Sequence, residues 1–69
     1  MVEIFKTNVT DHSQAKEIIA LLKQNFPCYS VNFDLHDCDN ILRVKGDSVP
    51  INEIEHLVSN AGFYCSVLN

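Results

Sequence analysis

The chain has few basic residues, and this shortage excludes several partners. Only 5 of its 69 residues are Lys or Arg, against 9 Asp or Glu, so the net charge is −4. Nucleic acids and anionic membrane surfaces are bound through clustered cations. The basic residues here are scattered along the chain, at Lys6, Lys16, Lys23, Arg43 and Lys45. We therefore expect no nucleic-acid partner and no membrane partner.

Long apolar runs are also missing. No stretch approaches the roughly 20 apolar residues that a transmembrane helix needs. The opening segment, MVEIFKTNVT, lacks the basic and apolar regions of a signal peptide. We expect a soluble protein located in the cytoplasm.

The chain has no pair of cysteines close in sequence. Cys28, Cys38 and Cys65 are an odd number and lie far apart. A secreted domain of this size normally carries an even set of disulfide-bonded cysteines. Reduced thiols are the simpler interpretation, which agrees with a cytoplasmic location.

The length leaves room for one domain, spanning residues 1–69. The composition, 46% hydrophobic and 20% charged, is that of an ordinary globular protein. A chain this short buries only about 60% of its unfolded surface, and it cannot form a cleft between two domains. Because no segment supplies an oxyanion hole or a deep substrate pocket, we predict that the protein is not an enzyme.

A first helix is predicted at roughly 12–26. Asp11 and Gln14 have the spacing of a capping box, and Pro27 stops the helix because the residue before a proline is pushed out of the α region. The apolar residues between them recur at steps of three and four, which is typical of an amphipathic helix. They are Ala15, Ile18, Ile19, Leu22 and Phe26.

A second helix is predicted after Pro50. Asn52 and Glu55 again have capping-box spacing, and Gly62 stands where helices often end in a left-handed residue. The apolar face of this helix consists of Ile54, Leu57, Val58 and Ala61.

Four segments favour strands because they are β-branched, aromatic or alternating. Residues 2–9 open the chain, residues 30–36 and 41–45 form a hairpin, and residues 63–68 make a last short strand. The order is strand, helix, strand, strand, helix, strand. Two amphipathic helices must then cover one face of a four-stranded antiparallel sheet. Right-handed crossovers give the sheet order 4-1-3-2. The predicted fold class is thus an α+β, ferredoxin-like βαββαβ sandwich.

This topology gathers three loops at one end of the sheet: residues 9–14, the hairpin turn 36–40, and residues 61–65. Exposed loops on a rigid scaffold often carry binding sites. We therefore predict a binding rim there, which we call the rim. It consists of Asp11, His12, His36, Asp37 and Phe63.

The chain resembles heavy-metal-associated domains, which occur in copper chaperones and metal-pumping ATPases. The likeness covers nearly all 69 residues and rests on length, element order, the hairpin, and the ending from Ile54 to Phe63. The family presents a Met-x-Cys-x-x-Cys loop before the first helix. Here the two cysteine positions fall on Asp11 and Gln14, or on His12 and Ala15. Neither pair can hold Cu(I) as two thiolates would.

Two functions follow as hypotheses. The first is a non-catalytic binding module, related to heavy-metal-associated domains, that docks a protein or a small ligand through the rim and needs no cofactor. The alternative is a metal-binding protein that holds Zn or Cu with His12, Cys38 and Cys65, which are drawn from separate loops.

A third hypothesis is a small-molecule sensor of the ACT type, which shares the element order but normally has a glycine-rich turn that this chain lacks. Either outer strand of the sheet, the second or the fourth, can in principle pair with another chain. The sequence does not indicate which of these two strands would pair. We expect a monomer or a weak dimer.

Overall fold

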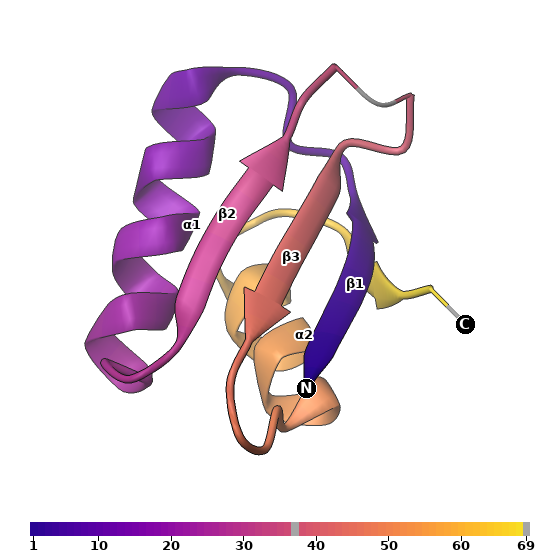
Figure 1. The fold of residues 1–69 in the computed structure, drawn as a ribbon. Helices are drawn as coiled ribbons and strands as arrows, with labels where there is room; N and C mark the ends of the chain where they lie inside the picture. Colours follow the sequence, from indigo (N-terminus) through magenta and orange to yellow (C-terminus); the bar gives the residue numbers. More distant parts are fainter. Residues whose placement is uncertain (37, 69) are drawn as a thin grey trace.

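The computed structural model describes residues 1–36 and 38–68. All four strands pair antiparallel, in the order β2-β3-β1-β4. This confirms the predicted α+β fold, because β2-β3-β1-β4 is the order 4-1-3-2 read from the other edge (Figure 1). The elements are β1 (Val2–Thr7), α1 (His12–Asn25), β2 (Ser30–Asp34), β3 (Ile41–Lys45), α2 (Ile51–Asn60) and β4 (Cys65–Val67).

The core lies between the sheet and the two helices. Phe5 of β1 stands opposite Leu42 of β3 and Val67 of β4, so their side chains point to the same face of the sheet. Phe5 and Leu42 are completely buried, and they meet the apolar stripes of both helices. The helical members of the core are Ala15, Ile18, Leu22, Ile54 and Val58.

Helix α1 begins as its sequence predicts. The Asp11 carboxylate accepts a hydrogen bond from the backbone N–H of Gln14 at 2.8 Å. The side-chain oxygen of Gln14 accepts from the N–H of Thr10 at 3.1 Å, one residue before the usual capping-box partner. The helix ends at Asn25, two residues before Pro27.

Helix α2 begins differently from the prediction. Its N-cap is Pro50, which makes no side-chain cap hydrogen bond, and the helix starts at Ile51. The predicted capping box of Asn52 and Glu55 is therefore wrong. The Glu55 carboxylate instead accepts a hydrogen bond from the backbone N–H of Val67 in β4, at 2.9 Å. The Glu55 side chain, which the local pattern assigns to the cap, thus makes a tertiary contact with β4.

The end of α2 shortens the last strand. Gly62 has φ +99°, its N–H bonds to the Ser59 carbonyl, and the N–H of Phe63 bonds to the Val58 carbonyl. This pair of bonds is a Schellman motif, and it confirms Gly62 as the residue after the C-cap. Because the N–H of Phe63 is bonded to the end of α2, the last strand starts later than predicted. β4 spans only Cys65–Val67 instead of 63–68.

None of the helices in the described part of the chain has the length and apolarity that a bilayer crossing requires.

Candidate functional site

The loops that were predicted to share one end of the sheet are joined there by hydrogen bonds. The backbone N–H of Thr7, the last residue of β1, donates to the Asp39 carbonyl at 3.2 Å. The Thr7 hydroxyl donates to the Asn40 carbonyl at 2.6 Å and accepts from the N–H of Val9 at 3.2 Å. Thr7 is only 4% exposed, so these bonds are shielded from water. The end of β1 therefore holds the hairpin turn and the loop that leads into α1.

The third loop is attached to the same place. The side-chain oxygen of Asn8 accepts a hydrogen bond from the backbone N–H of Tyr64 at 2.7 Å. Tyr64 is 55% exposed. Tyr64, an exposed aromatic residue, is thus attached to the loops beside the rim.

The rim residues themselves differ in exposure. Asp11 and His12 are exposed at the start of α1, where Asp11 is engaged as the cap. His36 is exposed, and its backbone N–H donates to the Asp34 carboxylate at 3.2 Å. Phe63 is half-buried and packs against the core. Asp37 lies outside the described residues.

The side chains proposed as metal ligands have different surroundings. His12 and Cys38 are exposed, whereas Cys65 is half-buried and packs against the core. Its strand position opposite the buried Thr7 directs the thiol toward the helices. Burial, helped by the negative charge of Glu55, raises the pKa of the Cys65 thiol to about 12. A thiol with this pKa is protonated at neutral pH, and the thiolate is the form that binds metals.

No group of three or more His, Cys, Asp or Glu side chains is arranged to hold a metal ion within residues 1–36 and 38–68. The metal hypothesis stays a prediction.

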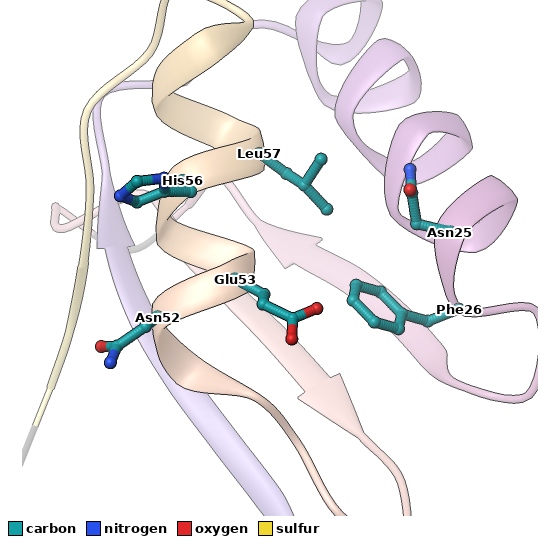
Figure 2. Close-up of a pocket in the computed structure, with 6 residues that line it drawn as sticks. All are labelled: Asn25, Phe26, Asn52, Glu53, His56 and Leu57. Atoms are coloured by element: carbon teal, nitrogen blue, oxygen red, sulfur yellow. The ribbon is translucent and has the colours of Figure 1, made fainter.

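A groove of about 510 Å³ lies on the helical side of the molecule. Phe26, at the end of α1, and Glu53 and Leu57 of α2 point into the space between the two helices (Figure 2). Asn25, Asn52 and His56 complete its lining. The groove has an apolar floor and a carboxylate, and its volume falls within the range of about 300–1,000 Å³ that is usual for small-ligand sites.

The groove is not evident from the sequence for a physical reason. Phe26 and Leu57 fall on the apolar stripes of their helices, a pattern that predicts core positions. In the structure the two residues are only half-buried, because the helices diverge where α1 ends. The sequence shows only that Phe26 and Tyr29 lie on either side of Pro27. In the structure their rings stack, with centroids 5.0 Å apart.

Comparison with protein-family models, with curated proteins and with solved structures gives no match for this chain. The ferredoxin-like fold is shown by the structure itself, through its element order and its sheet order.

Proposed function

We propose that the protein is a non-catalytic binding module that docks another protein through the rim. The observation that carries this proposal is the hydrogen-bonded conformation of the loop before α1. There, Asp11 is engaged as a helix cap and leaves His12 exposed beside it. The loop is closed by its own hydrogen bonds, so it presents side chains on a fixed backbone.

The surroundings of this loop support docking. Because Thr7 and Asn8 tie three loops together, the rim is a preorganised surface, and a partner need not order it on binding. Tyr64 adds exposed aromatic area, and aromatic residues are enriched in protein interfaces. The histidines at positions 12 and 36 add groups that can donate or accept hydrogen bonds.

Kinship with heavy-metal-associated domains is part of the proposal. It is supported by the βαββαβ order, by the loop between β1 and α1, and by Gly62-Phe63 after α2. In such a relative, Asp11 and Gln14 of the cap are one of the two possible pairs of cysteine positions, and His12 and Ala15 are the other. The metal loop has then become a helix cap.

A metal titration tests this proposal. We expect the backbone amides of residues 9–14 to keep their NMR shifts when one equivalent of Zn(II) or Cu(I) is added. Native mass spectrometry under the same conditions should show the bare chain. Sub-micromolar binding of one ion, lost in Cys38→Ser or His12→Ala, would contradict the proposal and establish the metal-binding alternative.

A second experiment tests the docking surface. Immobilised wild-type protein, the double variant His12→Ala/Tyr64→Ala, and the control Lys16→Ala are compared for the proteins they retain. All three altered positions are exposed, so the fold should be unaffected. A partner that binds through the rim is retained by the wild type and by Lys16→Ala but lost by the double variant. Equal retention by all three would refute docking at the rim.

The groove favours a second candidate function, the binding of a small molecule that has an apolar ring and an amine. Phe26 and Leu57 provide apolar contact, and Glu53 provides a negative charge for the amine. Aromatic amines should shift the amides of residues 52–57, and Leu57→Asn should abolish these shifts. Shifts that persist in Leu57→Asn, or that occur on the rim instead, would exclude the groove as their site.

A further inference from the structure

Strand β4 forms one edge of the sheet, and its backbone groups alternate in direction. The N–H of Leu68 donates to the Ile4 carbonyl at 2.8 Å, and the N–H of Tyr64 donates to Asn8. Both therefore face β1. The N–H groups of Cys65 and Val67, between them, face the open edge. Here the Glu55 carboxylate binds the N–H of Val67 at 2.9 Å.

The edge segment lacks several of the features that usually prevent strand addition. Natural edge strands are protected by shortness, charged side chains, proline or bulges, and of these β4 has the shortness, with three residues. Residues 63–68 read Phe-Tyr-Cys-Ser-Val-Leu, without a charge, a proline or a glycine. Tyr64 and Leu68 are 55% and 41% exposed beside this edge. The protection comes instead from α2, whose Glu55 occupies an outward-facing donor.

The opposite edge is different. Strand β2 carries Asp34, which forms an ion pair with Arg43 of β3 at 3.5 Å. A charged side chain on an edge strand is one of the features that discourage strand addition. Of the two outer strands that the sequence left open, β4 is the one that carries no charge.

We infer that β4 pairs antiparallel with β4 of a second copy of this chain, and that Glu55 competes with the second copy for the N–H of Val67. A two-fold axis offers each copy the same outward groups, which are self-complementary in an antiparallel pair. Two chains of net charge −4 repel each other, and an uncharged strand is where they can approach with the least repulsion. The inference concerns the sheet edge and does not depend on docking at the rim.

Sedimentation equilibrium of the wild type and of Glu55→Ala tests the competition. The wild type should dimerise weakly, and Glu55→Ala should dimerise more tightly by about tenfold, because a hydrogen bond to a charged acceptor no longer competes. Glu17→Ala removes the same charge from an exposed position on α1 and is the matched control. Equal tightening by Glu17→Ala would show a net-charge effect and overturn the inference. The inference would also be overturned if both the wild type and Glu55→Ala remained monomeric at millimolar concentration.

A second pair of variants tests the contact without touching Glu55. Ser66→Lys places a cation on β4, and Val2→Lys places one on β1, on the same face of the sheet and away from the edge. Both add one positive charge to a chain of net charge −4, yet only Ser66→Lys should weaken the dimer. In the wild type, concentration-dependent amide shifts should fall on residues 64–68. If they fall on residues 30–34 instead, the dimer uses β2 and the inference is wrong.

Discussion

The hydroxyl of Thr7 donates a hydrogen bond to the carbonyl of Asn40, 33 residues later in the chain, at 2.6 Å. The same oxygen accepts a hydrogen bond from the N–H of Val9. One buried side chain thus connects the end of β1 to the hairpin turn and to the loop before α1. Asn40 has φ +50°, a left-handed conformation that asparagine tolerates better than most residues. The arrangement of the rim therefore depends on a residue that does not itself belong to the exposed surface.

Replacing Thr7 with valine should test this dependence. Thr7→Val keeps the side-chain shape but leaves the Asn40 carbonyl and the Val9 N–H without this partner. We expect a loss of about 1–3 kcal/mol in the free energy of unfolding. Urea denaturation measures it, and amide exchange should become faster in residues 8–10. Thr10→Val, at an exposed position, should stay within about 0.5 kcal/mol of the wild type. Equal losses in both variants would mean that Thr7 has no special role.

The cap of α1 gives a second prediction. Asp11→Ala removes the acceptor for the N–H of Gln14 and should lower the free energy of unfolding by about 1 kcal/mol. Asp11→Asn retains an acceptor oxygen and should lose much less. Thermal unfolding of the three proteins measures the difference. If the asparagine variant is as unstable as the alanine variant, the hydrogen bond to Gln14 is not what stabilises the start of the helix.

Gly46 and Tyr29 give a third prediction. A Cβ added to Gly46 would lie 2.6 Å from the Tyr29 ring, and that ring is held in place because its hydroxyl donates to the Ser48 carbonyl. Gly46→Ala should therefore destabilise the protein by about 1–3 kcal/mol, the usual cost of overpacking. In a protein that already carries Tyr29→Ala, Gly46→Ala should lower the free energy of unfolding only slightly. A double-mutant cycle measured by urea unfolding checks this coupling. Additive losses would show that the ring is not what excludes the methyl group.

The Cys65 thiol predicts a pH dependence. Its pKa is about 12 in the folded protein, against an ordinary value of 9.0, because the thiol is buried and lies near Glu55. Since the folded pKa is raised, the unfolded chain releases this proton first. The stability contribution is fully present below pH 9.0 and is lost as the pH rises toward 12. Urea unfolding between pH 8 and pH 11 should show a steeper loss in the wild type than in Cys65→Ala. Parallel curves would contradict the raised pKa.

The reactivity of the same thiol provides an independent measurement. Cys28 and Cys38 are exposed and should react with an aromatic disulfide reagent at pH 8, whereas Cys65 should react only when the chain unfolds. Mass spectrometry of the labelled chain identifies which residues are modified. Fast labelling of Cys65 in the native protein would show that the thiol is not buried.

Much of the fold can be predicted from the sequence, because the signals that specify it are local. The N-terminus of α1 depends on Asp11 and Gln14, three residues apart, and the end of α2 depends on Gly62 alone. The change from helical spacing to alternation locates the β2–β3 hairpin. Connection rules then leave one sheet order, which the structure has. Each of these signals acts within a few residues of the element that it specifies.

The candidate site was less predictable, because its features depend on residues that are distant in sequence. Glu55 fits a cap by its spacing but binds Val67 of β4. Phe26 and Leu57 fit a core by their periodicity and do pack against it, but both are half-buried and also line a groove between the helices.

The sequence by itself determined the order of the elements, their amphipathic faces and hence the end of the sheet at which the three loops meet. The tertiary structure alone decided which polar groups Thr7, Asn8 and Glu55 engage and how deeply Cys65 is buried. The reason is physical. Periodicity and capping act over a few residues, whereas hydrogen-bond partners and burial depend on chain segments that only folding brings together.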